Sequence, residues 1–467
     1  MLLYYATTTI DTISAAAPMA LTAFSNVGNK VHERTVKIKS SIKKEAKNMA
    51  SVHANEETVD TPLLKFESNW MMGYQWPITT IQYYTGDTNA AATWLENRWK
   101  EVVTANPWVC STLVKDKKKH GKLLAMRYSK DSPDIARTFQ VKDGLDLDQN
   151  MPYADLCKTI SDAKDICVSN GNGLIKSEMP VCKLTLAPNK EKNGFAVIFS
   201  MCHVVGDGHT YYSILNMLSA TSEIVGMDVT RNEKFSMEEA GPEITGEKEY
   251  KFLLSPPLCM MCYYMGIMMK AKKVEPECYY VDTEKLKELK EKAKTEEGAA
   301  PYVSTNDLIT SGFGRAVKAQ MLHMPANIRG KKEGCGKNLA GNYITEIILG
   351  DDALTSANSI RQILNGKAPF SRGKMPGCCI SGNWAAMITN WSSMSEGNVE
   401  IPDCTQTMHL PYLNTKEMME DSCVIFKARP NQVACMFFLQ SVTIEDVKKE
   451  LPFLREKVSE TMFGAKK

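Results

Sequence analysis

The chain has 467 residues, of which 56 are Lys or Arg and 54 are Asp or Glu, so its formal net charge is +2. Its 43% hydrophobic and 24% charged residues exclude a wholly disordered chain, a collagen-like repeat and a protein with many membrane spans. The near-neutral net charge argues against a protein that coats nucleic acid, because such a protein would carry an excess of basic residues. Fourteen Cys in so long a chain favour reduced, mostly buried thiols and hence a cytoplasmic protein.

Residues 1–61 are expected to form a tail outside the fold, and we place the start of the folded part near Pro62. The tail begins apolar and almost uncharged, and a basic stretch follows from Lys30 to Lys47. That order is typical of a membrane-surface anchor. A loose tail or an organelle-targeting segment is the alternative, which the weak hydrophobicity favours. No basic residues precede the apolar part, so a secretory signal peptide fits poorly.

Residues 62–273 are expected to form a first half of mixed helices and strands. Asp87 or Thr88 can cap a helix that reaches about Thr104, and a turn and a strand follow. The pattern then predicts a helix over 151–170, strands over 181–186 and 195–201 joined by a polar hairpin loop, and a helix over 210–224.

The apolar run FLLSPPLCMMCYYMGIMM covers residues 252–269, and three lysines follow by residue 273. Two prolines leave a dozen continuous apolar residues, fewer than the roughly 20 that span a bilayer. The run fits a helix lying on the surface of an intracellular membrane. It fits a buried linker helix equally well, and periodicity does not separate the two.

Residues 274–467 are expected to form a second half. Asp282 or Thr283 can cap a charged helix that reaches about Glu297, and a second helix is expected over 306–320. Strands are expected over 379–390 and 434–442, and a last helix near Thr443. The alternation predicts an α/β protein with mixed sheets in two halves.

The segment FSMCHVVGDGHTYYSIL contains His203, Asp207 and Gly208 in an HxxxDG pattern. A strand before the pattern and a helix after it place His203 at a strand end, where its imidazole can face a cavity and transfer protons near neutral pH. Asp207 can fix the turn, and Gly208 allows a close backbone approach or an unusual φ. A histidine that only caps the strand end is the alternative. A metal site is not expected, because no further ligands stand at suitable spacing.

The pattern and its neighbours resemble the HxxxDG superfamily of coenzyme A-dependent acyltransferases. This superfamily includes chloramphenicol acetyltransferase, the plant BAHD enzymes, the wax ester synthases and condensation domains. Further segments that resemble it are 95–114, 281–317, Arg329 with Gly341-Asn342, and 388–394. The resemblance therefore runs from about residue 62 to residue 467. Cys202 replaces the first of two histidines found in many relatives, and the late DFGWG motif of plant BAHD enzymes is absent.

The resemblance implies two chloramphenicol acetyltransferase-like halves, with mixed sheets flanked by helices and an active-site tunnel between them. It implies His203 as the general base, with Asp207 and Gly208 as structural support. Thr389, Asn390 and Trp391 would line the acyl or acceptor site, and Arg361, Lys367, Arg372 and Lys374 are expected at the coenzyme A phosphates. Acyl-CoA would be a co-substrate, with no permanently bound cofactor or metal. The acceptor would be a small alcohol or amine, and we expect a monomer.

Several functions remain open within this resemblance. A wax ester or diacylglycerol synthase and a specialised-metabolite acyltransferase both fit, as does a condensation-type enzyme that takes its donor from a carrier protein. A non-catalytic lipid- or partner-binding protein on the same fold is the alternative outside enzymes. The intact set of His203, Asp207 and Gly208 favours an enzyme, because a binding protein has no need of a base.

Overall fold

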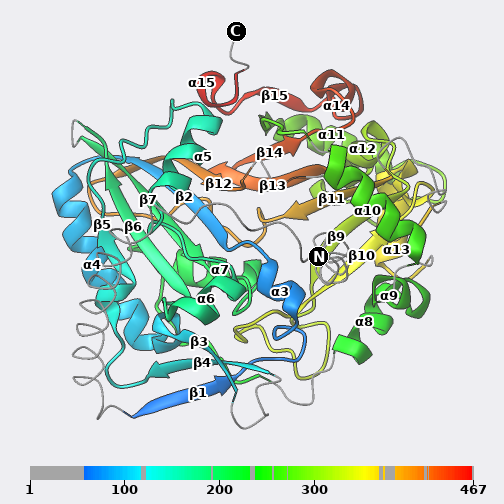
Figure 1. Ribbon diagram of the computed structural model, residues 1–467. Coiled ribbons are helices and arrows are strands. Elements are labelled where there is room, and N and C mark those ends of the chain that lie inside the picture. Colours follow the sequence, from blue (N-terminus) through cyan, green and yellow to red (C-terminus); the bar gives the residue numbers. More distant parts are fainter. Residues whose placement is uncertain are drawn as a thin grey trace, which may run out of the picture.

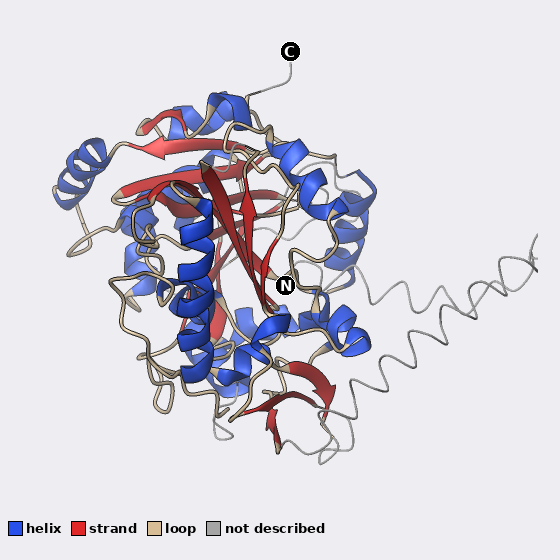
Figure 2. Ribbon diagram, turned by 90° about the vertical axis from the view of Figure 1, so that its left-hand side faces the viewer, coloured by secondary structure: helices blue, strands red, loops and turns tan. Residues whose placement is uncertain are grey.

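The computed structural model describes residues 57–464 apart from 117–122, 191–192, 232–236, 255–256, 271, 368–371, 374–383, 415–417 and 419. Residues 1–56 of the tail expected over 1–61 lie outside the described residues, and so does the expected phosphate contact Lys374. The described strands form a five-stranded, a seven-stranded and a three-stranded sheet. Helices flank the two larger sheets, so that strands occupy the interior (Figures 1 and 2).

The five-stranded sheet has the order β12-β2-β7-β6-β5. Its strands are β2 (Ile78–Thr85), β5 (Phe139–Val141), β6 (Cys182–Pro188), β7 (Gly194–Met201) and β12 (Thr405–Pro411). The predicted hairpin of β6 and β7 is confirmed by their antiparallel pairing. Helix α4 (Thr88–Ala105) packs against this sheet through the buried Leu95, Trp99 and Val102. Asp87 caps α4 as expected, because its side chain accepts from two backbone N–H groups of the first turn.

The seven-stranded sheet has the order β10-β9-β11-β13-β14-β8-β15. Its strands are β8 (Glu277–Val281), β9 (Met321–Asn327), β10 (Ile344–Leu349), β11 (Ala385–Asn390), β13 (Asp421–Arg429), β14 (Gln432–Phe438) and β15 (Leu454–Lys457). Helices α11 (Thr283–Lys294), α12 (Thr305–Ala316) and α13 (Ala357–Leu364) lie near one another along one side, where Phe313 of α12 packs against Phe437. The predicted cap of α11 is present at Asp282, and the predicted last helix, α14 (Ile444–Glu450), is capped by Thr443.

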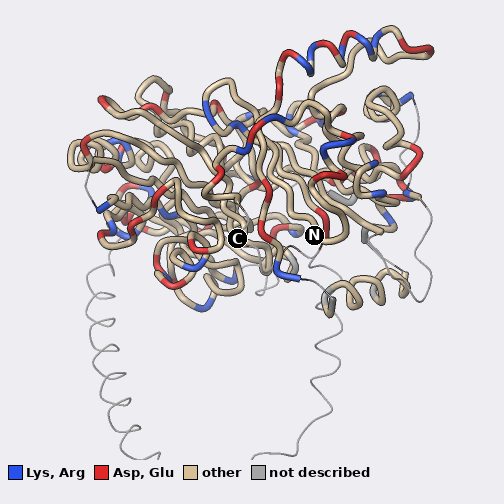
Figure 3. Tube along the Cα trace, turned by 90° about the horizontal axis from the view of Figure 1, so that it is seen from above, with Lys and Arg blue, Asp and Glu red and all other residues tan. Residues whose placement is uncertain are grey.

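The smaller elements complete the chain. The three-stranded sheet consists of β1 (Thr58–Pro62), β4 (Leu124–Ser129) and β3 (Thr112–Lys115). The remaining helices are α3 (Trp70–Tyr74), α5 (Tyr153–Asp162), α6 (Gly171–Ser177), α7 (Gly208–Asn216), α8 (Met237–Thr245), α9 (Glu247–Leu254), α10 (Leu258–Lys270) and α15 (Glu460–Phe463), with 3-10 turns at Pro107–Cys110, Ile135–Arg137 and Ala353–Thr355. Lys and Arg are interspersed with Asp and Glu along the chain (Figure 3).

Helix α10 lies within the apolar run whose role the sequence leaves open. Tyr263 and Tyr264 are buried and pack in one cluster with residues of the seven-stranded sheet, including Ile348. The buried-helix alternative expects this packing. Leu258 and Met269, by contrast, are 72% and 79% exposed. No helix in the part of the chain that the structure describes combines the length and apolarity needed to cross a membrane.

Two predicted helices are shorter than expected. The helix expected over 151–170 is interrupted after α5, where Lys164 adopts a φ of 44°. The helix expected over 210–224 begins at Gly208 and ends at Asn216. Beyond it, the Arg98 guanidinium donates hydrogen bonds to the carbonyls of Met217, Ser219 and Ser222. These carbonyls therefore accept hydrogen bonds from a side chain of α4, in place of the backbone N–H groups that a longer helix would supply.

Candidate active site

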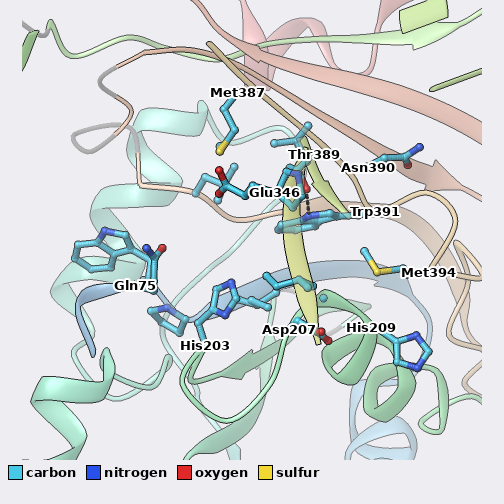
Figure 4. Close-up of a pocket in the computed structure, with 18 of the residues that line it drawn as sticks. Gln75, His203, Asp207, His209, Glu346, Met387, Thr389, Asn390, Trp391 and Met394 are labelled. Carbon is cyan, nitrogen blue, oxygen red and sulfur yellow. Dashed lines mark hydrogen bonds between the residues drawn. The ribbon is translucent and has the colours of Figure 1, made fainter. Parts of the chain in front are cut away.

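A cavity of about 1310 Å³ is lined by residues between Phe66 and Val424, among them residues of α7, β10 and β11. Seven of the residues singled out in the sequence line it: His203, Asp207, Gly208, Arg361, Thr389, Asn390 and Trp391. Lys367 and Arg372 are not among the residues that line it. The cavity thus joins the HxxxDG segment to the strand that the resemblance places opposite it (Figure 4).

The turn between β7 and α7 fixes the position of His203. Val204 and Val205 are fully buried and anchor the turn in the core. Asp207 ends the turn as the N-cap of α7, its carboxylate accepting from Thr210 N at 3.1 Å. Gly208 does not have a positive φ. A Cβ there would lie 2.9 Å from Cε at the tip of the Met394 side chain, which would have to shift to make room for it.

Asn342 sets the protonation pattern of the His203 ring. Its Nδ2 donates to the carbonyls of His203 and Val204, at 2.8 and 3.2 Å. Its Oδ1 therefore faces His203 Nδ1, 3.1 Å away, and can only accept. The neutral ring must then carry its proton on Nδ1, which leaves the lone pair of Nε2 as the base.

Burial lowers the pKa of His203, while its own backbone carbonyl and Asp207 act in the opposite direction. The net direction is downward, so the imidazole stays neutral in neutral solution. A neutral imidazole with a proton-free Nε2 is the form that can accept a proton. His209 also lines the cavity, but its Nε2 is engaged 2.9 Å from the Lys337 carbonyl.

A buried ion pair that the sequence did not reveal holds Asn342 in place. Glu67 Oε1 accepts from Asn342 N at 2.8 Å, and Glu67 Oε2 accepts from Arg231 Nε at 2.8 Å. Gly341, just before Asn342, has a φ of 134°, and a Cβ there would lie 2.9 Å from Arg231 Cζ. A glycine is therefore required where the Gly-Asn pair of the resemblance stands.

Asp207 belongs to a second buried ion pair and points away from the reacting face of His203. Its Oδ2 accepts from Arg329 Nη1 at 2.7 Å and from Tyr343 N at 3.0 Å. Both charged side chains are 1% exposed. Asp207 thus ties the turn to the segment that carries Asn342, which is a structural role.

Thr389 and Trp391 lie at the end of β11 across the cavity from His203 (Figure 4). Trp391 Nε1 donates to Thr389 Oγ1 at 3.1 Å. The Thr389 hydroxyl accepts this bond, so its own proton can donate into the cavity. Asn390 is turned toward other partners, since its Nδ2 donates to Asn306 Oδ1 and its Oδ1 accepts from Ser392 N.

Two of the expected phosphate contacts, Arg361 and Arg372, are engaged in ion pairs. Arg361 donates to both carboxylate oxygens of Asp307, each at 2.9 Å. Arg372 pairs with Glu249, and its guanidinium carbon lies 4.1 Å from the centroid of the Phe252 ring. In the described parts of the chain, no cluster of three or more His, Cys, Asp or Glu is arranged to hold a metal ion.

Comparison with known proteins identifies the fold. No protein-family model and no curated protein matches the chain. TRI101 of F. graminearum complexed with ethyl coenzyme A has a TM-score of 0.60 at 14% identity, covering 86% of this chain and 100% of that one. The same protein with coenzyme A and T-2 mycotoxin gives 0.56 at 14% identity and the same coverage. Vinorine synthase gives 0.52 at 10% identity, covering 86% of this chain and 95% of that one.

At such identities the similarity concerns the fold. It agrees with the mixed sheets flanked by helices, and so confirms the predicted fold class. The chain has the α/β fold of TRI101 and vinorine synthase.

Proposed function

We propose that the protein is an acyltransferase that moves an acyl group from acyl-CoA to the hydroxyl or amine of a small acceptor. The observation that carries the proposal is His203, a neutral histidine whose proton-free Nε2 lies in a cavity large enough for two substrates. The fold supports it, because TRI101 has been crystallised with coenzyme A and with T-2 mycotoxin.

In this mechanism His203 acts as a general base and then as a general acid. Nε2 accepts the proton of the acceptor O–H or N–H while the acceptor atom bonds to the thioester carbonyl carbon. The tetrahedral intermediate collapses with cleavage of the C–S bond, and Nε2 returns the proton to the thiolate. Free coenzyme A and an ester or amide result, without an acyl-enzyme. Cys202 is fully buried and takes no part.

The Thr389 hydroxyl is the proposed donor to the oxyanion of the tetrahedral intermediate. Its orientation is fixed by the indole N–H of Trp391. A donor that is already oriented costs no reorganisation when charge develops on the carbonyl oxygen.

The remaining assignments rest on the resemblance. We propose the basic stretch of Arg361, Lys367, Arg372 and Lys374 for the coenzyme A phosphates, and a boundary between the halves near residue 273. For this role the guanidinium groups of Arg361 and Arg372 would have to bind the phosphates as well as their present carboxylate partners.

The exposed Leu258 and Met269 of α10 support peripheral membrane contact through residues 252–273. We propose that the protein acts as a cytoplasmic monomer.

The test is the release of coenzyme A from short- and long-chain acyl-CoAs with pooled alcohols, amines and diacylglycerol. Wild type is compared with His203→Ala and with the control His209→Ala, which replaces a histidine in the first turn of α7. We expect acceptor-dependent release that the first variant loses and the second keeps. If no donor gives release, two interpretations remain: an enzyme that takes its acyl group from a carrier protein, or a non-catalytic binding protein. Release that persists in folded His203→Ala would refute the assignment of the base.

A further inference from the structure

A second group of ionisable side chains lines or adjoins the same cavity, under helix α10. Glu346 of β10 and Glu420, just before β13, line the cavity, and His323 of β9 lies beside them. His323 Nδ1 is 2.8 Å from Glu346 Oε2, and the two side chains are 3% and 15% exposed. Glu346 raises the pKa of His323 against the effect of burial, so this pair is an ion pair without net charge.

Glu420 is the additional acid of this group. It is 2% exposed, yet neither of its carboxylate oxygens has a hydrogen-bond partner at normal geometry in the described chain. Its nearest charged neighbours are His323, Glu346 and Asp421, and the Tyr264 hydroxyl adjoins it. Asp421 is turned elsewhere, because it accepts from Gln440 N and Ser441 N. A buried carboxyl without a strong partner is stable when it is protonated, and its ionised form is stabilised by a cation that a ligand brings into the cavity.

The charge of Glu420 indicates which kind of ligand it meets. In Figure 4, Glu346 and Met387 lie above His203, and Met394 and His209 lie to its right. Coenzyme A carries several phosphates, and like charges brought together at an interface are strongly unfavourable. Because Glu346 is paired with His323, Glu420 is the carboxylate of this group that adds net negative charge when it is ionised, and it favours a cationic ligand over a phosphate.

We propose that Glu420, with the His323–Glu346 pair beside it, binds a protonated amine of the acceptor, while a hydroxyl or second amine of the same molecule reaches His203. This inference rests on the proposed acyltransferase function and narrows its acceptor to a basic amino alcohol or diamine. The walls suit such a ligand. Tyr250 and Tyr264 are among the lining residues, and aromatic rings near a cation are favourable; Met387 also lines the cavity, where its apolar side chain suits an alkyl chain.

The register of the sheet gives the spacing of the two ends. Met387 pairs with Ser422 and Thr389 with Val424 in the parallel ladder of β11 and β13. Glu420 thus lies four residues before Val424, which at roughly 3.3 Å per residue is about 13 Å from the level of Thr389. An acceptor must bridge a gap of this order, so a medium or long alkyl chain is required between its two polar ends.

The experiment compares ω-amino alcohols of butyl, octyl and dodecyl length with the diols of equal length, by kcat/KM for coenzyme A release. The proteins are wild type, Glu420→Gln and Glu277→Gln, which removes a carboxylate from β8, toward the other edge of the same sheet. We expect octyl or dodecyl amino alcohol to be preferred over its diol by about 10- to 100-fold in wild type and in Glu277→Gln. Glu420→Gln should lose this preference and keep its activity on the diol.

The wild-type protein provides a test that needs no stable variant. Burial raises the pKa of Glu420 to about 7, so Glu420 ionises, and binds a cation better, as the pH rises through that value. The ratio of kcat/KM for amino alcohol to that for diol should rise over the same range, since any effect of His203 is common to both substrates. A ratio that is near unity, or independent of pH, overturns the inference.

Binding of octane diamine to His203→Ala, measured by calorimetry, separates this inference from the proposed function. Binding that disappears in the His203→Ala/Glu420→Gln double variant supports the amine site even if wild type releases no coenzyme A. Coenzyme A release with neutral alcohols only, and no binding of the diamine, would keep the acyltransferase and refute the amine site.

Discussion

Replacing Asp207 tests whether this residue supports the fold or takes part in the reaction. In Asp207→Ala the guanidinium of Arg329, 1% exposed, is left in the core without its anion. An uncompensated buried charge costs about 3–5 kcal/mol, and loss of the N-cap of α7 adds about 1 kcal/mol. The expected loss of about 4–6 kcal/mol is comparable with the whole stability of many domains.

The assay is urea unfolding followed by tryptophan fluorescence, with kcat/KM measured on the folded fraction. Asp207→Asn is the milder variant, because its amide oxygen can still accept from Thr210 N and cap α7. Arg329→Met removes the cation, and the double variant Asp207→Ala/Arg329→Met should cost less than the sum of the two single changes. An Asp207→Asn protein as stable as wild type but nearly inactive would refute the structural role.

The remaining predictions concern single side chains of the site and of the core. His203→Ala should lower kcat by roughly 10²–10⁴-fold, the usual contribution of a positioned base, with an unchanged urea midpoint. Thr389→Val should lower kcat by about 10²–10³-fold if the hydroxyl meets the oxyanion, whereas Thr389→Ser should retain most of it; equal losses in both would exclude that role. Asn342→Asp places an anion at Nδ1 and should raise the pKa of His203, so the acid limb of the pH–kcat/KM profile moves to higher pH; a limb that stays in place means that His203 is not the titrating base. Burial lowers the pKa of His409 to about 3, so the unfolded chain binds a proton that the folded chain does not as pH falls below about 6.5. This linkage removes about 2 kcal/mol of stability at pH 5, and the difference between urea midpoints at pH 5 and pH 7.5 should be smaller in His409→Gln.

The sequence predicted the parts of the site that depend on neighbouring residues. His203, Asp207 and Gly208 stand within one strand–turn–helix unit, so periodicity and turn chemistry suffice to place His203 at a strand end. Thr389 and Trp391 were placed by resemblance, and the structure locates them on the same cavity as His203. Their roles remain predictions.

The partners of these residues could not be predicted from the sequence, because they are brought together only by contacts between distant parts of the chain. Glu67 meets Arg231 across 164 residues and Asn342 across 275 residues. No local pattern distinguishes Glu67 from the many surface glutamates, although its complete burial makes it part of the support for His203. The end of α7 was missed for the same reason, since the carbonyls that follow it are bound by Arg98.

Strand β12 has a consequence for synthesis on the ribosome. It pairs with β2, and His409 and Gln82 on these strands are separated by 327 residues. At roughly 5–20 residues per second, β2 waits on the order of tens of seconds for its partner, with one edge unpaired. Nascent chains released before residue 405 cannot close that edge. They therefore expose a strand that recruits other chains, and prematurely terminated products should aggregate rather than persist as half-proteins.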